Sequence, residues 1–414
     1  MNAFAIIILA ALVLEFSLKL VGSLLNLNSL KLELPSMLQG IYKPEDYRKS
    51  QQYLRVTTRF DLVDSGFTLL LLLVFWFSGG FNWFDKVIIN WKFIPLVSGL
   101  LYIGMLFFAY SLLKLPFSIY GTFVIEDRFG FNKTTPRTFV LDQLKGLLLI
   151  IILGGLILTG ILILFQYESN YAWLYCWGIV TIFSLALQCI APTWIMPLFN
   201  KYKPLDSGEL RDGILKYTRS VNFPVKNILV MDGSRRSSKS NAFFTGFGSN
   251  KRIALFDTLI TQQTIPETVA VLAHEVGHYK KKHILQGTII GFVHTGLIFF
   301  LLHVFVGNPG LYRAFYINQQ PIYAGLLFFG LLYTPLELVL SATTQIISRK
   351  HEYQADRYAA ETIDEPASLI EALKKLSANN LSNLTPHPFY VFLNYSHPPL
   401  LQRVKAIQGI KKKI

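Results

Sequence analysis

Charged residues are scarce in this sequence of 414 amino acids. They make up only 15% of the chain, whereas hydrophobic residues make up 52%. A soluble chain of this length carries roughly a quarter charged residues, so the deficit predicts an integral membrane protein. The net charge is +14, and in a membrane protein such an excess is typical of cytosolic loops. We therefore expect contacts with the lipid bilayer and no nucleic-acid partner.

Cysteine is almost absent as well. The two cysteines, Cys176 and Cys189, lie in one apolar run, so a disulfide framework is not expected. A cleavable leader is not expected either. The first apolar stretch has no basic segment before it, contains Glu15 and Lys19, and is not followed closely by a small-residue cleavage site. We interpret this stretch as a retained membrane helix.

Long apolar stretches are the main positive signal. Seven are long enough to cross a bilayer of about 30 Å, near residues 3–25, 65–82, 94–115, 146–166, 171–197, 284–306 and 321–347. The segments between and after them carry six, two, four, none, fourteen, one and ten Lys and Arg residues in chain order. This alternation predicts an N-terminus outside and a C-terminus in the cytosol. We predict a membrane domain of five spans (1–197) and a second domain (198–414) with spans six and seven and a cytosolic segment (348–414).

Ionisable residues also occur inside the spans. One interpretation is that those near span ends reach the membrane surface and that Glu15 pairs with Lys19 one turn later. The alternative is that the helices line a water-filled cavity. Both interpretations concern the same six residues: Glu15, Lys19, Lys114, His294, His303 and Glu337.

The stretch LAHEVGHYKKKH (272–283) carries the strongest chemical signal. On a helix His274 and His278 lie on one face, where two imidazoles can chelate one zinc ion and Glu275 stands beside it as a general base. Thr264 and Glu267 form a capping-box pattern before a good helical run. The residue types and their spacing therefore predict a zinc-binding helix.

Two further residues of this stretch affect its geometry. Gly277 weakens a helix by up to about 1 kcal/mol, but its smooth backbone allows a neighbouring element or the substrate to approach closely. His283 follows His274 by nine residues, which at about 100° per residue places it on the opposite face of a continuous helix. We therefore do not expect His283 to be the third ligand.

A catalytic zinc needs a third protein ligand and one open position. Glu352 and Asp356 are four residues apart in SRKHEYQADRYA (348–359), just after the seventh span. Spans six and seven should form an antiparallel hairpin, so His278 and Glu352 lie roughly 8–9 Å beyond the same membrane boundary if both helices continue straight. Glu352 is then the expected ligand, and Asp356 accepts a hydrogen bond from a ligating histidine. The alternative is a solvated helix face with salt bridges to Arg349 or Arg357.

Together these motifs resemble the type I CAAX prenyl proteases, which are seven-span zinc metalloendopeptidases. The resemblance covers nearly the whole chain and rests on HEVGHYKKKH, SRKHEYQAD, SNAFFTGFG (240–248) and YSHPPLLQRVKAI (395–407). The related HtpX-type membrane peptidases share the zinc motifs but have fewer spans. We expect an all-α polytopic membrane protein with seven transmembrane helices and a cytosolic, gluzincin-like zinc peptidase portion that contains a small β-hairpin or sheet.

The resemblance also implies a hydrated chamber enclosed by the helices and roles for particular residues. It implies that one Zn²⁺ per chain is bound by His274, His278 and Glu352, and that Glu275 is the catalytic base. It further implies that a second group of residues contacts the peptide or the reacting carbonyl: Asn241, His397 and Arg403.

The residues of this second group can also be interpreted without the family. In NAFFTGFG the residues Phe243, Thr245 and Phe247 alternate with Phe244 and Gly246. This alternation predicts a strand that pairs with RIALF (252–256) across GSNK. The edge of this strand could hold an extended substrate, which makes Asn241 and Phe243 candidate substrate-binding residues; the alternative is a hairpin that only covers apolar surface. His397 precedes two prolines and Arg403 lies in the following helix. A lone histidine and arginine in such positions more often have a structural role.

The expected activity is peptide hydrolysis without a covalent intermediate. The resemblance implies a prenylated C-terminal CaaX substrate from which the last three residues are removed. Two alternatives stay open: a quality-control peptidase for unprenylated membrane proteins, and a seven-helix receptor or transporter without enzymatic activity. Short outer loops favour a prokaryotic plasma membrane, with the endoplasmic reticulum as the location if the protein is eukaryotic. The KKKI end is either a retrieval signal or a lipid-binding tail.

Overall fold

The computed structural model describes residues 1–30, 33–34, 43–167, 170–245 and 252–410. Within these residues seven helices are long and apolar enough to cross a membrane, which confirms the predicted number. They are α1 (Ala3–Asn28), α2 (Pro44–Phe77), α4 (Pro95–Tyr120), α5 with α6 (Pro136–Leu149, Gly155–Tyr167), α7 (Ala172–Ile190), α12 (His283–Val306) and α14 (Ile322–Thr362). Short π-helical turns extend α4 to Glu126, join α5 to α6, and join α7 to α8 (Met196–Phe199).

The beginnings of several helices follow directly from the sequence. Proline is well suited to the first helical position, because the backbone donor that it lacks has no partner there in any case. The helices that begin in this way start at Pro44, Pro95, Pro136, Pro309, Pro366 and Pro388. Asn2 caps α1 by accepting a hydrogen bond from the Ala5 amide (3.0 Å).

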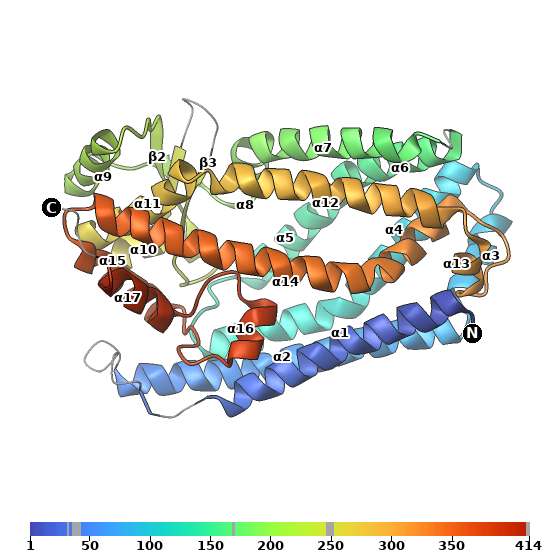
Figure 1. The fold of residues 1–414 in the computed structure, drawn as a ribbon, viewed down its shortest axis with the longest axis horizontal. Helices are drawn as coiled ribbons and strands as arrows, with labels where there is room; N and C mark the ends of the chain where they lie inside the picture. The colour runs from blue at the N-terminus through green and yellow to red at the C-terminus, as the bar shows by residue number, and fades with distance from the viewer. Residues whose placement is uncertain (31–32, 35–42, 168–169, 246–251, 411–414) are drawn as a thin grey trace.

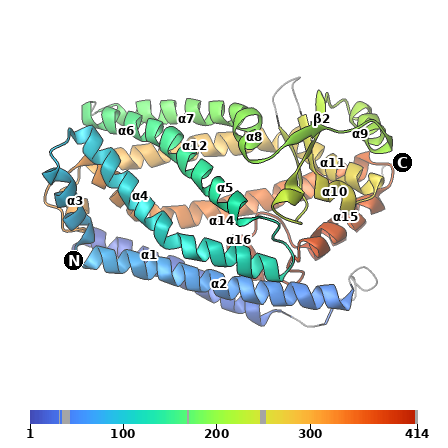
Figure 2. The same cartoon turned by 180° about the vertical axis from the view of Figure 1, so that it is seen from behind.

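The long helices lie roughly along one axis of the molecule (Figures 1 and 2). α7 and α12 lie side by side along one edge, α1 and α2 lie along the opposite edge, and α14 runs between them. At most 33% of the residues in any of the seven apolar windows are buried inside the protein. The remaining apolar faces are suited to contact with lipid. The enclosed hydrated chamber stays a prediction.

Among the described residues, two large hydrophobic cores and two smaller ones stabilise the fold. One lies at the end of the molecule that holds the N-terminus, where α3 (Gly80–Asn90) and α13 (Pro309–Arg313) close the long helices (Figure 1). There Trp76 stacks on Phe315 with ring centroids 4.7 Å apart and donates its indole hydrogen to the Ala314 carbonyl (2.8 Å). The second core lies between the sheet and the helices α9 (Glu209–Ser220), α11 (Ile265–Lys280) and α15 (Pro366–Asn379). Both cysteines are free, as predicted.

The sheet has four strands in the order β1-β2-β4-β3. They are β1 (Tyr202–Pro204), β2 (Asn227–Met231), β3 (Ala242–Thr245) and β4 (Arg252–Phe256). β2 and β4 are parallel, whereas β1 and β3 are antiparallel to their neighbours, with Phe243 opposite Ala254. The predicted pairing of the two short segments is therefore confirmed, and β3 is an edge strand. The predicted turn GSNK, and Gly246 and Phe247 before it, lie outside the described residues, as does the KKKI end.

Polar residues inside the spans bond to one another across helices. Lys19 donates to Ser65 of α2 instead of pairing with Glu15, so the predicted pair one turn apart is wrong. Glu15 instead lines a small cavity together with Glu337. His294 lies 3.2 Å from Glu337. For Glu15 and Glu337 these contacts favour the interpretation in which polar residues face a cavity between the membrane helices.

The remaining helices are short and lie near the C-terminus or beside the sheet. They are α10 (Asp257–Gln262), α16 (Pro388–Asn394) and α17 (Leu400–Gln408). α16 lies between α14 and α1 in Figure 1 and contacts both.

A short segment before β3 ties the membrane helices to the sheet. The Arg236 guanidinium donates to both carboxylate oxygens of Asp142 in α5 (2.7 and 2.9 Å) and to the side-chain oxygen of Asn200 (2.7 Å). The Lys133 amide donates to the Arg236 carbonyl (3.0 Å). Bidentate pairs of this kind fix orientation as well as distance, so Arg236 sets how the chain enters β3.

We expect Arg236→Ala to destabilise the protein by about 1–2 kcal/mol, because it leaves the half-buried Asp142 carboxylate without its partner. Thermal unfolding in detergent measures this effect as a lower apparent melting temperature. Arg235→Ala, at the exposed neighbouring arginine, is the matched control and should change little. Asp142→Ala combined with Arg236→Ala should cost less than the sum of the single variants; full additivity would contradict a direct coupling.

Candidate metal centre

The helix α11 begins where the sequence predicts it. Thr264 and Glu267 form the expected capping box, in which the Thr264 amide donates to the Glu267 carboxylate over 2.8 Å. Lys375 of α15 lies 2.7 Å from the same carboxylate. These contacts define where α11 begins, and the helix then carries the two histidines on one face.

Gly277 allows α11 and α14 to cross at very short range. A β-carbon at this position would lie 3.0 Å from both the α-carbon and the carbonyl oxygen of Ala355, and 3.3 Å from the β-carbon of Tyr358. Because these neighbours include backbone, a side chain at position 277 would force the two helices apart. The predicted close approach at Gly277 is therefore made by a neighbouring helix.

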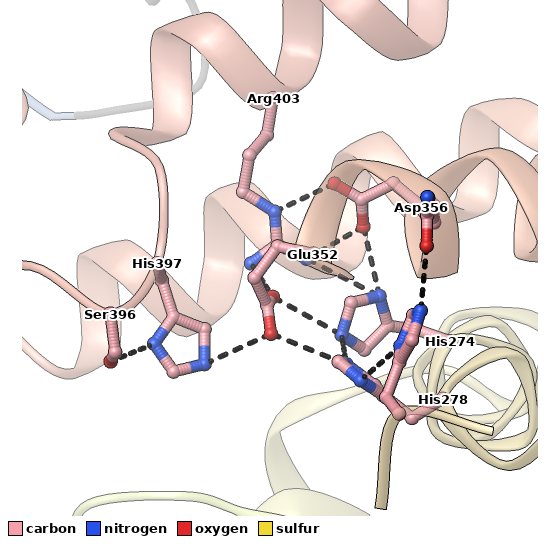
Figure 3. Close-up of polar contacts among 9 residues, drawn as sticks. His274, His278, Glu352, Asp356, Ser396, His397 and Arg403 are labelled. Atoms are coloured by element: carbon pink, nitrogen blue, oxygen red, sulfur yellow. Dashed lines mark hydrogen bonds and ion pairs between the residues drawn. The ribbon is translucent and has the colours of Figure 1, made fainter. Parts of the chain in front are cut away.

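This crossing brings three side chains with ligand atoms together (Figure 3). His278 Nε2 lies 3.1 Å from His274 Nε2 and 3.2 Å from Glu352 Oε1, and His274 Nε2 lies 3.4 Å from Glu352 Oε2. One ligand atom from each residue lies within 4.8 Å of the other two. Among the described residues this is the one such group of three, and it consists of the residues that the sequence predicts.

The chemistry of this group fits a metal ion. Two imidazoles and one carboxylate are a common donor set for zinc. Glu352 Oε2 is buried and has no hydrogen-bond partner, which is costly unless another group satisfies it. Two imidazole nitrogens 3.1 Å apart also repel each other unless a proton or a cation lies beside them. A cation would satisfy all three side chains.

Asp356 and Arg403 lie directly behind the three side chains. Asp356 Oδ1 accepts the Nδ1 proton of His274 over 2.9 Å, which leaves Nε2 free. Arg403 donates from Nε and Nη2 to the same carboxylate (2.8 and 2.6 Å), and its Nη1 lies 3.5 Å from Glu352. Asp356 is 1% exposed and Glu352 is 4% exposed, so the solvated helix face that was the alternative is excluded.

The neighbouring carboxylates favour a positive charge at His274. Burial lowers the pKa of the imidazole, but hydrogen bonds to Asp356 and Glu352 outweigh that effect and raise the pKa to about 9. The pocket therefore stabilises a positive charge beside Nε2, whether a proton or a metal ion provides it.

Glu275 faces the same cavity as the three side chains. The cavity has a volume of about 680 Å³, and its lining includes His274, Glu275, Glu352 and Arg403. Burial raises the pKa of the Glu275 carboxyl. A carboxylate with raised proton affinity, open to a cavity beside a metal-binding group, is suited to take a proton from water.

Only some of the predicted substrate-contacting residues line this cavity. Asn241 and His397 line the cavity, and His397 Nε2 lies 3.4 Å from Glu352 Oε1 while its Nδ1 contacts the Ser396 hydroxyl (2.8 Å) (Figure 3). Phe243 packs edge-on against Phe256, with centroids 6.2 Å apart, and is not among the described residues that line this cavity. Asn241 and His397 thus lie within reach of a peptide bound there.

Comparisons with known proteins identify the family. Residues 24–201 match the family model "CAAX prenyl protease N-terminal, five membrane helices", and residues 204–411 match "Peptidase family M48". A CAAX prenyl protease 1 homolog from Arabidopsis thaliana is 38% identical and is covered over 93% of its length by 94% of this chain. CAAX prenyl protease 1 from Saccharomyces cerevisiae is 35% identical, with 92% of this chain and 90% of the relative covered.

The crystal structure of Ste24p from S. mikatae is also similar, with a TM-score of 0.93 and 34% sequence identity. The match covers 98% of this chain and 99% of that one. The chain belongs to the CAAX prenyl protease group of peptidase family M48. It is therefore a multi-pass membrane metallopeptidase, and the interpretation as a receptor or transporter is excluded.

In this peptidase His283 does not lie where the sequence places it. α11 ends at Lys280, Lys282 adopts a left-handed conformation (φ 59°), and α12 begins at His283. His283 Nδ1 is consequently 3.0 Å from His278 Nδ1. The prediction of an opposite face is wrong because it assumed one continuous helix. The contact is to the other nitrogen of His278, so His283 is still not placed as a third ligand.

Two other polar residues near the site were not singled out as site residues from the sequence. Arg349 Nη1 donates to the Val391 and Tyr395 carbonyls (3.1 and 2.6 Å) and so holds the end of α16, just before His397. Gln354 contacts the ring of His283 (2.8 Å). Both lie in SRKHEYQAD, but no spacing rule distinguishes them there from solvated residues.

We expect Gly277→Ala to lower metal affinity at least tenfold, because the added β-carbon separates the two helices that carry the ligands. Competition with a metal chelator measures the affinity. Gly287→Ala in α12 is the matched control: nothing lies within 4 Å of its β-carbon position, so alanine should only favour the helix. Equal metal affinity in the two variants would show that the close crossing is not needed.

Proposed function

We propose that this enzyme is a zinc metalloendopeptidase that binds one Zn²⁺ through His274, His278 and Glu352. The observation that carries the proposal is the convergence of these three side chains, which lie within 4.8 Å of one another beside Glu275. We also propose that residues 1–197 form the membrane domain and residues 198–414 the peptidase domain. The two family matches, which meet between residues 201 and 204, support this division.

Peptide hydrolysis follows from the positions of the side chains. Zinc held by these three residues would polarise a carbonyl group and lower the pKa of bound water. Glu275 takes the proton of the attacking water and delivers it to the leaving amine. Asp356 holds His274 in the tautomer that leaves Nε2 free, and Arg403 balances the charge of the buried carboxylates.

The substrate is proposed to bind along β3. The outer edge of this strand has backbone groups that β4 does not use, and an extended peptide can pair with such an edge. Asn241, at the start of the strand, lines the cavity and can donate from its side-chain amide. We propose that His397, whose side chain is 62% exposed, stabilises the developing oxyanion. The predicted contact of Arg403 with the carbonyl stays a prediction, because its guanidinium is already engaged by Asp356.

We propose that the substrate is a prenylated protein with a C-terminal CaaX sequence, from which the enzyme releases the aaX tripeptide. The names of the relatives, CAAX prenyl protease 1 and its homologs, support this substrate. A membrane-embedded enzyme also suits a lipid-modified substrate, because the lipid need not leave the bilayer. The alternation of basic residues supports an N-terminus outside and a C-terminus in the cytosol. The prokaryotic plasma membrane stays a prediction.

We expect Glu275→Gln to lower peptide cleavage by about 10²–10⁴-fold while bound zinc stays at one ion per chain, because the amide cannot accept the water proton. Metal analysis and cleavage of a C-terminal peptide by the purified protein measure the two quantities. Glu361→Gln, at an exposed glutamate of α14, should leave both unchanged. Retained cleavage in Glu275→Gln would remove Glu275 as the base.

We expect a farnesylated CaaX peptide to be cleaved with a kcat/KM at least tenfold higher than that of the same unprenylated peptide, since each buried methylene contributes about 0.8 kcal/mol. Mass spectrometry should detect the free C-terminal tripeptide. Equal cleavage of the two peptides, or cleavage at scattered bonds, would favour the quality-control peptidase instead.

A further inference from the structure

We infer that His283 and Gln354 are positioning residues that select the metal-binding tautomer of His278. The inference rests on the proposed metal site and adds a second chain of hydrogen bonds to it. Two hydrogen bonds form this chain: His278 Nδ1 lies 3.0 Å from His283 Nδ1, and His283 Nε2 lies 2.8 Å from Gln354 Oε1.

The direction of this chain follows from counting protons. Gln354 Oε1 can only accept, so His283 carries a proton on Nε2. A neutral imidazole has one N–H, and His283 Nδ1 is therefore an acceptor. The facing nitrogen, His278 Nδ1, must then carry the proton that lies between the rings. His278 Nε2 is left with a free lone pair, and this is the atom that faces His274 and Glu352.

The opposite orientation of the Gln354 amide would reverse each step. The amide would donate to His283 Nε2, His283 would donate from Nδ1, and His278 would carry its proton on Nε2. A protonated Nε2 cannot bind a metal ion. The amide orientation that we assign is thus the one that is compatible with metal binding.

His274, the other ligand histidine, also has a hydrogen-bond partner at Nδ1, but of a different chemical type. His274 donates from Nδ1 to the buried carboxylate of Asp356 (2.9 Å), whereas His278 donates to a neutral imidazole. Both ligand histidines therefore have a partner for Nδ1 and a free Nε2. The difference lies in charge, since only the partner of His274 is an anion.

The His283 ring is buried and packed against a second ring. The left-handed Lys282 turns the chain so that α12 begins at His283, whose exposed fraction is 5%. The ring stacks on that of His351, with centroids 4.0 Å apart and an interplanar angle of 8°. His351 and Gln354 both lie on α14, as does Glu352, so the helix that carries the third ligand also holds the His283 ring that faces His278 Nδ1.

Two substitutions of the same residue test the inference. His283→Leu fills the space but cannot accept a hydrogen bond, whereas His283→Gln can accept one through its side-chain oxygen. We expect the leucine variant to bind Zn²⁺ 10- to 100-fold more weakly in competition with a chelator, and the glutamine variant to recover most of that loss. The visible spectrum of the Co²⁺-substituted protein should shift for leucine and return towards wild type for glutamine. His303→Leu, further along α12, is the matched control and should bind zinc as the wild type does.

Gln354→Leu provides an independent variant at the other end of the chain. It should weaken Zn²⁺ binding in the wild-type background and have little additional effect in His283→Leu, because both substitutions break one chain. Equal zinc affinity in wild type and His283→Leu would overturn the inference, as would equal losses in the leucine and glutamine variants. A wild-type protein without a tight zinc site would instead contradict the proposed function itself.

Discussion

The close crossing of α11 and α14 at Gly277 is the constraint on which the site depends. α11 supplies two of the candidate ligands and α14 the third, so the distance between the helix axes decides whether they can share one ion. With glycine at 277 and alanine at 355 the backbones approach as closely as β-carbons allow. A glycine inside a helix costs up to about 1 kcal/mol, and here the cost is offset by the packing that it permits.

Buried charged residues lie beside this crossing. Glu352 and Asp356 are buried carboxylates, and Arg403 lies against both. Removing Arg403 would leave both buried carboxylates without this cation, and an unpaired buried charge is far more costly than an exposed one. The same carboxylates favour a cation at the two histidines. The same two carboxylates therefore contribute both to the ion pairs with Arg403 and to metal binding.

Hydrogen bonds from two arginines connect membrane helices to the segments around this site. Arg236 ties α5 to the segment that enters β3, and Arg349 ties α14 to the end of α16 just before His397. Asn241, at the start of β3, and His397 line the same cavity. Membrane helices thus determine where a substrate can lie, although the proposed chemistry belongs to the residues of the second half.

By itself the sequence determined the number of spans, the helix with the histidine pair, the third candidate ligand and the β3–β4 pairing. These features depend on local periodicity, on spacing within one helix, or on the depth at which two adjacent spans end. Tertiary structure alone decided that α11 stops before His283, that Lys19 bonds to Ser65, and that Arg349 and Gln354 support the site. Such contacts depend on backbone turns and on helices far apart in the chain. A single hydrogen bond of this kind produces no repeating pattern of residue types, so it cannot be predicted from the sequence.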